Sequence, residues 1–166
     1  MHFVFHLICM ILAFKGGFGY NIIVRIFLVE AGKTEKIIEV EKMKKEIATK
    51  NAPGAVGPYS QAVVVGNTIY VSGQIPLNPE TGELVNEIGA AAHQVFKNMQ
   101  AILNEAGYTM ADVAKTVVFL ANINDFAKVN EIYAQYFEKP YPARSCVAVK
   151  ELPKGALLEM ECIAGK

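Results

Sequence analysis

Arginine is scarce in this sequence, and Arg144 stands where its particular chemistry would matter. Of sixteen basic residues only Arg25 and Arg144 are arginines, and Arg144 lies in "PARSC" (142–146), directly before an apolar run. A guanidinium binds a carboxylate through two parallel hydrogen bonds, which a lysine ammonium cannot do. The position therefore indicates either a carboxylate-binding site or a structural ion pair.

Two acidic residues near the C-terminus offer the complementary charge. In "ALLEMECIA" (156–164), Glu159 and Glu161 are separated by one residue, and side chains alternate between the two faces of a strand. If this run is a strand, both carboxylates lie on one of its faces. If the run after Pro142 is also a strand, Arg144 and Cys146 share one face of that strand. If the two strands are antiparallel neighbours, the arginine and the carboxylates lie near each other.

On the residues alone, two interpretations of these charges stay open. One is a structural Arg–Glu pair at a sheet edge or a subunit interface. The other is a site in which Arg144 holds a carboxylate, while a nearby glutamate holds or activates water or shuttles a proton.

The other reactive side chains favour structural roles. His93 lies in a predicted helix among alanines, and Cys146 has no histidine base in view, which favours a small buried thiol. Ser60 and Ser72 lack a Ser-His-Asp set, whereas the hydroxyl of Tyr59, in a Gly/Pro loop, could reach a ligand. No phosphate-binding glycine motif and no cluster of metal ligands is present, so we expect neither a cofactor nor a metal.

Hydrophobic periodicity predicts the elements that must position these side chains. β-Branched residues predict a hairpin over 62–74 with a tight turn at Gly66-Asn67, a strand over 112–122, and strands over 144–151 and 156–164 joined by the turn "LPKG". The short turn is what makes the last two strands candidates for antiparallel neighbours.

Two amphipathic helices separate these strands. The first is predicted to be capped near Asn86 and to stop at Gly107, and the second to be capped by Asn124 and to end before Pro140. Their apolar stripes comprise Ile88, Ala92, Val95, Met99, Ile102, Leu103 and Ala106 in the first, and Phe126, Val129, Tyr133, Tyr136 and Phe137 in the second.

The resulting order is β-β-α-β-α-β-β, which predicts an α+β two-layer sandwich with both helices on one face of a mostly antiparallel sheet. The second face of such a sheet needs a partner, so we expect an oligomer.

Composition agrees with a globular protein. The 166 residues are 52% hydrophobic and 19% charged, with a formal net charge of zero, which argues against a basic nucleic-acid-binding surface. Three cysteines without C-x-x-C spacing argue against a disulfide framework or a zinc site and fit a cytoplasmic location.

Residues 1–42 differ from the rest of the chain. Two apolar runs, the second interrupted by Arg25, precede a charged piece and then Met43, which could itself be a start. The first run is shorter than the roughly 20 residues that span a bilayer. We expect an upstream extension or leader outside the domain; an export signal or anchor and an added structural element are the alternatives. Residues 43–166, with eleven basic and twelve acidic residues, form a single domain of net charge −1.

Four stretches of this domain closely resemble the Rid family, also called the YjgF type, and within it the RidA branch of 2-iminobutanoate/2-iminopropanoate deaminases. They are "NAPGAVGPYSQAV", "YVSGQIPLNPETGEL", "NDFAKVNEIYAQYF" and "PARSCVAVKELPKGALLEMECIA". The resemblance covers residues 43–166. It implies a chorismate-mutase-like fold, a barrel-like homotrimer and active sites in the clefts between subunits.

The resemblance also implies roles for individual residues. Arg144 resembles the arginine that binds the substrate carboxylate, and the backbone around Cys146 the element that meets the reacting end. Glu159 resembles the glutamate that positions water, and Tyr59 the tyrosine that closes the pocket from the neighbouring subunit. The ligand-contacting positions are Ser72, Gly73 and Asn130.

The implied reaction is cofactor-free hydrolysis of 2-imino acids or enamines, released by pyridoxal-phosphate dehydratases, to 2-oxo acids and ammonia. The segment "EKPYP" (138–142) is shorter than in some members of the family that the chain resembles, which bears on substrate range. A non-catalytic sensor of small carboxylates is the alternative; a ribonuclease or translation inhibitor is a further one, against which the neutral charge argues.

Overall fold

The computed structural model describes residues 7–14, 22–29, 36–39 and 44–166. The chain divides into two compact units, Met1–Met43 and Lys44–Lys166, and the predicted boundary at 42/43 lies outside the described residues. In the first unit β1 (Leu7–Phe14), β2 (Ile22–Val29) and β3 (Lys36–Glu39) form an antiparallel sheet in that order. None of the described helices has the length and apolarity required to span a bilayer.

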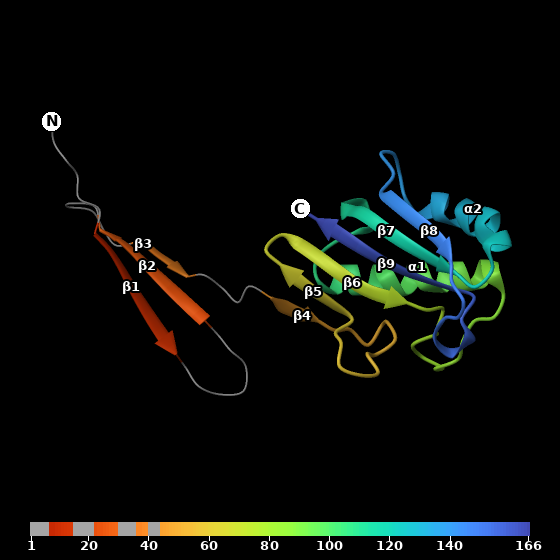
Figure 1. Cartoon of the computed structure of the whole chain (residues 1–166), viewed down its shortest axis with the longest axis horizontal. Coiled ribbons are helices and arrows are strands. Elements are labelled where there is room, and N and C mark those ends of the chain that lie inside the picture. Colours follow the sequence, from red (N-terminus) through yellow and green to blue (C-terminus); the bar gives the residue numbers. More distant parts are fainter. Residues whose placement is uncertain (1–6, 15–21, 30–35, 40–43) are drawn as a thin grey trace. The chain divides into compact units, whose positions relative to one another are not determined.

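The second unit is a six-stranded sheet with two helices on one face (Figure 1). Its elements are β4 (Lys45–Ile47), β5 (Ala62–Val65), β6 (Thr68–Gln74), α1 (Ile88–Glu105), β7 (Val113–Leu120), α2 (Phe126–Tyr136), β8 (Ala143–Ala148) and β9 (Leu158–Gly165). The strand order is β4-β5-β6-β9-β7-β8, and only β7 and β8 pair in parallel. The α+β class and the mostly antiparallel sheet are confirmed; β4 is an additional edge strand that the sequence pattern did not reveal.

The β5–β6 hairpin forms as predicted. Val65 pairs with Thr68, so the turn consists of Gly66 and Asn67, and Gly66 has a φ of 58°. This left-handed conformation is available to glycine without a steric penalty.

Helix α1 begins one residue later than the sequence indicates. Its N-cap is Glu87 and not Asn86: the carboxylate accepts hydrogen bonds from the backbone N–H groups of Gly89 (2.9 Å) and Ala90 (2.7 Å). These hydrogen bonds lower the pKa of Glu87. At the other end Gly107, with a φ of 77°, ends the helix as predicted.

The start of α2 also differs from the prediction. A 3₁₀ turn over Ile123–Asp125 leads into the helix, and the side chain of Asn122, not Asn124, caps this turn by accepting from the Asn124 N–H. Of the predicted stripe, Val129, Tyr133 and Phe137 are buried together with Ile132, Tyr136 is half-buried and Phe126 is exposed.

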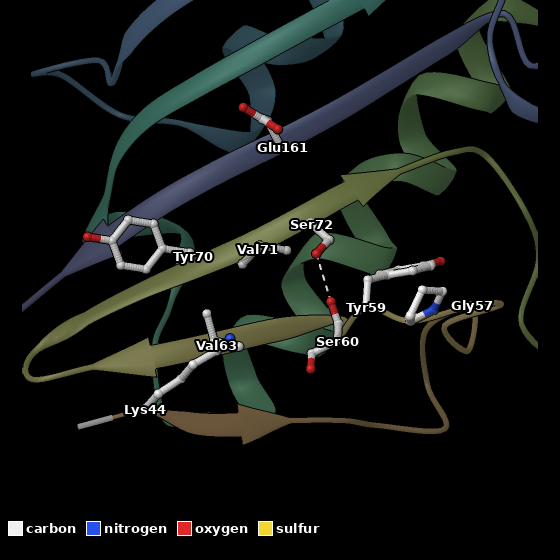
Figure 2. A pocket seen from close by; sticks show the side chains of 10 residues that line it. Lys44, Gly57, Tyr59, Ser60, Val63, Tyr70, Val71, Ser72 and Glu161 are labelled. Carbon is white, nitrogen blue, oxygen red and sulfur yellow. Dashed lines mark hydrogen bonds between the residues drawn. The ribbon is translucent and has the colours of Figure 1, made fainter. Parts of the chain in front are cut away.

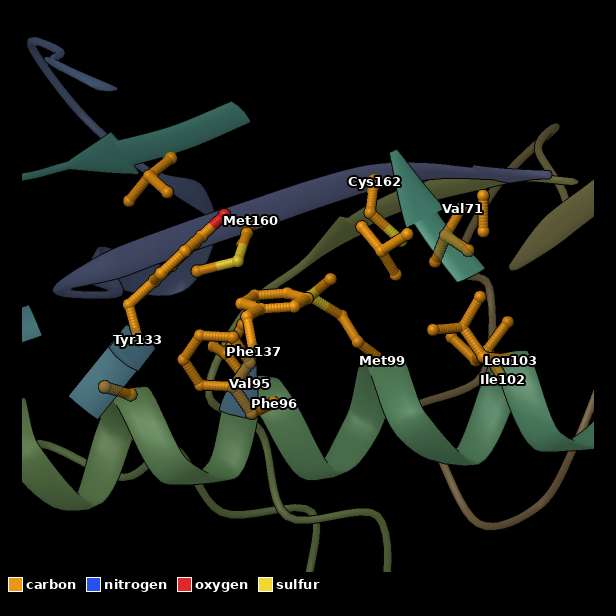
Figure 3. Packing of buried hydrophobic residues seen from close by; sticks show 14 of the residues in the cluster. Val71, Val95, Phe96, Met99, Ile102, Leu103, Tyr133, Phe137, Met160 and Cys162 are labelled. Carbon is orange, nitrogen blue, oxygen red and sulfur yellow. The ribbon is translucent and has the colours of Figure 1, made fainter. Parts of the chain in front are cut away.

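The core lies between the helices and one face of the sheet (Figure 3). Phe96 of α1 stacks on Tyr136 of α2 with ring centroids 4.2 Å apart, which locks the two helices together. Leu158, Met160 and Cys162 of β9 complete the core from the sheet side.

The opposite face of the sheet carries apolar side chains that nothing in the described part of the chain covers. Val65, Tyr70, Val147 and Ile163 are each exposed by 37–47%. An apolar sheet face of this kind is typical of an interface.

The position of the last two strands corrects one expectation. β8 and β9 are not neighbours: β8 is the sheet edge and pairs only with β7, whereas β9 lies between β6 and β7. The connection between β8 and β9 therefore passes from one side of β7 to the other, and β7 separates Arg144 from Glu159 and Glu161.

Candidate functional site

Arg144 lies on the helix side of the edge strand β8. Its Nη2 donates a 2.8 Å hydrogen bond to Oδ1 of Asn130 in α2. The guanidinium carbon is 4.5 Å from the ring centroid of Tyr133 and 5.5 Å from that of Phe126. Two aromatic rings and one amide thus hold the cation in a defined orientation.

The Tyr133 ring beside Arg144 is itself held in place by a buried hydrogen bond. The hydroxyl of Tyr133 lies 2.9 Å from Oγ1 of Thr116, which is fully buried and pairs with Arg144 across β7 and β8. Burial raises the pKa of Tyr133, while the hydrogen bond to Thr116 and the charge of Arg144 act in the opposite direction. The phenol is therefore neutral and acts as a rigid platform.

A small hollow of about 260 Å³ opens beside Arg144. Its walls are formed by Asn130, Tyr133, Ala134, Tyr141, Pro142 and Arg144. It is thus mainly apolar with a cation and an amide at one end, which suits a small organic acid.

Cys146, two residues along β8, shares the face of Arg144 as predicted and packs against the core. Burial raises its pKa, opposed only in part by the charge of Arg144. A thiol with a raised pKa is neutral at pH 7 and is a poor nucleophile.

Glu159 lies on the opposite, helix-free face of the sheet. Its neighbours Leu158 and Met160 are buried in the core, so the predicted alternation along β9 is confirmed. Burial raises the pKa of Glu159, and the like charge of Glu161 on the same face raises it further. A carboxylate with a raised pKa is suited to accept and return a proton near neutral pH.

The absence of a side chain at Gly73 leaves space for the carboxyl group of Glu159. Between Val71 and Gln74 the pairing of β6 with β9 shifts register, so that Ser72 and Gly73 form a bulge. The Glu159 carboxyl group lies directly over the Gly73 backbone: a Cβ on Gly73 would overlap Oε1 and lie 2.8 Å from Cδ. Only glycine leaves room for this close approach.

Tyr59 and Ser72 line an open groove of about 730 Å³ on this same face, together with Glu161 (Figure 2). The Ser72 hydroxyl donates to the backbone oxygen of Ser60 at 2.7 Å. The Tyr59 side chain is 51% exposed. This groove and the Glu159 carboxylate form a second group of candidate residues, separate from the group around Arg144.

Within one chain the two groups do not meet. Arg144, Asn130 and Cys146 lie on the helix side of β8, whereas Glu159 lies on the other face, in a strand that β7 separates from β8. Among the described residues the only ion pair joins Lys128 to Glu131. The expected proximity of Arg144 and the carboxylates through antiparallel pairing is therefore wrong for a single chain.

Sequence reasoning missed the supporting residues. The apolar periodicity predicts Tyr133 only as a core residue, and the contact of the Phe126 ring with Arg144 leaves no periodic signal. His93 is a half-buried boundary residue whose Nδ1 lies 2.9 Å from the Tyr136 hydroxyl, at the contact between the two helices. In the described ranges no three His, Cys, Asp or Glu side chains come together as metal ligands would.

Comparison with known proteins shows which family the chain belongs to. The chain matches the model of a family described as Endoribonuclease L-PSP over residues 49–166, that is, over nearly all of the second unit. The chain belongs to this family, also called Rid or YjgF. The matched range includes every candidate site residue named above.

Relatives in this family carry both specific and generic names. The human protein named 2-iminobutanoate/2-iminopropanoate deaminase is 51% identical over 123 residues, 74% of this chain and 90% of the human one. A Pyrococcus horikoshii protein with only a RutC family name is 51% identical over 125 residues, 75% and 99% of the two chains. The crystal structure of the Escherichia coli YjgF gene product superimposes with a TM-score of 0.71 at 48% identity, over 74% and 98% of the chains.

Proposed function

We propose that this protein hydrolyses reactive 2-imino acids and their enamines, such as 2-iminobutanoate and 2-iminopropanoate, to 2-oxo acids and ammonia. The observation that carries the proposal is the oriented guanidinium of Arg144 at one end of a small apolar hollow. Such an arrangement suits a short-chain organic acid bound by its carboxylate. Relatives with about 50% identity that are named as this deaminase support the reaction class.

The active site is proposed to form between two copies of the chain. Arg144 and Glu159 lie on opposite faces of one sheet, so a second copy must supply the missing half. The uncovered apolar face around Tyr70 and Ile163 gives such a copy a surface to pack on. A closed ring of three chains would bury this face in every subunit and make three equal sites.

In this site the chemistry needs no strong nucleophile, because an imine carbon is already electrophilic. Arg144 binds the substrate carboxylate through two hydrogen bonds. Glu159 of the neighbouring copy accepts a proton from a water molecule as the water oxygen bonds to the carbon of the protonated imine, giving a neutral carbinolamine. Glu159 then returns this proton to nitrogen. The C–N bond breaks as the C=O bond forms, and the hydroxyl proton passes to the regenerated Glu159 carboxylate and from there to the departing ammonia, which leaves as ammonium. Positioning of water and substrate contributes several kcal/mol in steps of this kind.

The remaining candidates are assigned supporting roles. Asn130 orients Arg144 by its hydrogen bond and borders the ligand. The Ser72-Gly73 bulge holds the backbone beside Glu159, and Tyr59 closes the cleft from the neighbouring copy. Cys146 shapes the site as a neutral thiol while its backbone faces the reacting end. A pyridoxal-phosphate dehydratase would supply the imine, and no cofactor takes part.

The test couples the protein to a threonine dehydratase and follows imine loss against 2-oxobutanoate formation. Wild type should accelerate imine loss, and Arg144→Lys should lower kcat/KM roughly 10- to 150-fold, because one hydrogen bond to a charged group contributes about 1.5–3 kcal/mol. Lys97→Arg, on the exposed side of α1, is the matched control and should be unaffected. If the wild-type protein does not accelerate imine loss, the proposed deaminase activity is rejected. If Arg144→Lys is fully active, the binding of the substrate carboxylate by two hydrogen bonds from Arg144 is rejected.

The family description favours one other activity, cleavage of RNA. The charge balance of −1 over residues 43–166 argues against it, because binding of a phosphate backbone requires a basic surface. Incubation with single-stranded RNA should leave the RNA intact, while cleavage that Arg144→Lys abolishes would replace the proposal. Binding of 2-oxobutanoate without turnover of imine would instead identify a sensor of small carboxylates.

A further inference from the structure

A buried glutamine organises the loop that carries Tyr59. Residues 48–61 connect β4 to β5 without any helix or strand. A connection of this length in a compact domain is usually functional and needs hydrogen bonds to hold one conformation. Gln61, its last residue, is only 3% exposed although its side chain is polar.

Every polar atom of the Gln61 side chain is used within this loop. Its Oε1 accepts a 2.6 Å hydrogen bond from the Thr49 N–H. Its Nε2 donates to the backbone oxygens of Thr49 (3.0 Å), Ala52 (3.2 Å) and Pro53 (2.8 Å). One amide thus connects the start of the loop to its end, and its loss would leave buried and half-buried backbone groups without these hydrogen-bond partners.

The other side of the same segment is tied to the bulge. Ser72 donates through its hydroxyl to the Ser60 oxygen at 2.7 Å (Figure 2). Its backbone N–H donates to the Gln61 oxygen at 3.0 Å. The segment between Tyr59 and β5 is therefore fixed on one side by the Gln61 amide and on the other by Ser72.

Tyr59 itself makes few hydrogen bonds that would fix its side chain. Its ring is half exposed, and its hydroxyl makes only a 3.4 Å contact with the N–H of Val56. Its backbone N–H donates to the Gly57 oxygen at 2.9 Å. The orientation of the tyrosine side chain therefore depends on the backbone, and the backbone depends on Gln61.

We propose that Gln61 is a positioning residue: its buried amide fixes the 49–60 loop and so aims Tyr59 at the substrate cleft. The catalytic part of this inference rests on the proposed function, in which Tyr59 closes the cleft; the structural part does not. Misplacement of a catalytic group by about 1 Å can lower a rate by about two orders of magnitude. Loss of the amide should therefore affect turnover beyond its effect on stability.

A double-mutant cycle tests the catalytic part. Gln61→Met keeps the length of the side chain and removes its hydrogen bonds. In a Tyr59 background it should lower kcat/KM about 10- to 100-fold; in a Tyr59→Ala background it should have almost no effect, because the two changes remove the same contribution. Equal losses in both backgrounds would overturn the proposal.

Two further variants separate positioning from a general loss of stability. Gln61→Asn keeps both polar groups but shortens their reach by one methylene, and it should show the same dependence on Tyr59 if Gln61→Met does not fold. Asp112→Ala removes a cap in which the carboxylate accepts from the Thr109 N–H (2.7 Å) and hydroxyl (2.9 Å), on the connection between α1 and β7. It should lower Tm and leave kcat/KM unchanged; a matching loss of kcat/KM there would show that destabilisation alone explains the Gln61 effect.

A fluorescence measurement tests the structural part without catalysis. The chain contains no tryptophan, so Tyr59→Trp introduces a single reporter into the loop. Adding Gln61→Met should lower the emission anisotropy and increase quenching by acrylamide. Unchanged anisotropy and quenching would overturn the role of Gln61 even in an active deaminase, whereas an inactive wild type with the expected fluorescence change would reject only the proposed function.

Discussion

Subunit complementation is the most direct consequence of the placement of Arg144 and Glu159. In each chain these residues lie on opposite faces of the sheet, with β7 between their strands. If each site takes its arginine from one copy and its glutamate from the next, two inactive variants should restore each other. The pair to mix is Arg144→Gln and Glu159→Gln.

The expected yield follows from counting subunits around a closed ring. After equimolar mixing by co-refolding, half of the subunits at the arginine position carry an intact arginine, and half of those at the glutamate position carry an intact glutamate. About one quarter of the sites therefore contain both. The initial rate of imine loss should recover to about 25% of the wild-type rate, although each parent alone is nearly inactive.

A second mixture provides the matched control. Wild type mixed with a chain that carries both substitutions should also give about one quarter of the wild-type rate if sites are shared, and about one half if each site lies within one chain. A variant mixture that stays at the level of its parents, together with a half-maximal control, would refute the shared site.

Two other predictions concern Glu159. Gly73→Ala should lower kcat about tenfold with little change in Tm. The added Cβ displaces the Glu159 carboxyl group, which is the mobile end of a side chain and can move without disturbing the core. If kcat stays at the wild-type value while a Tm scan shows a folded protein, Glu159 acts from another conformation. The acid limb of the pH–rate profile should move to lower pH in Glu161→Gln. Burial and the Glu161 charge raise the pKa of Glu159, and removal of the like charge lets the carboxylate form at lower pH; an unshifted limb would assign the titration to another group.

Local patterns of the chain were sufficient for the elements and their faces. Alternation along β9 places Leu158 and Met160 in the core and Glu159 outside it, because strand geometry has a period of two. Gly107 marks the end of α1 because a left-handed residue there is best supplied by glycine. These features depend on neighbours in sequence, which is why they could be predicted.

Pairing across the sheet could not be predicted in the same way. The short turn before β9 suggested that β8 is its neighbour, but turn length limits only how far the chain travels and not which edge it joins. One signal was present in the inward positions: those of β9, such as Leu158 and Met160, are apolar and fully buried, as expected of a central strand. The inward positions of β8 carry the charged Arg144 and the half-buried Cys146, as expected of an edge. The role of Gly73 likewise depends on contact with a distant strand.

The same sheet explains why a single chain holds two incomplete groups. Arg144 needs aromatic support, and α2 can provide it only on the helix side, where Tyr133 is anchored to buried Thr116. Glu159 needs a backbone that it can approach closely, and the bulge at Gly73 provides this only on the open face. Each side chain is therefore confined to its own face of the sheet, and neither can cross the sheet to reach the other. Assembly is then a requirement of the proposed chemistry, since only a second copy can bring an arginine on the helix side to a glutamate on the open face.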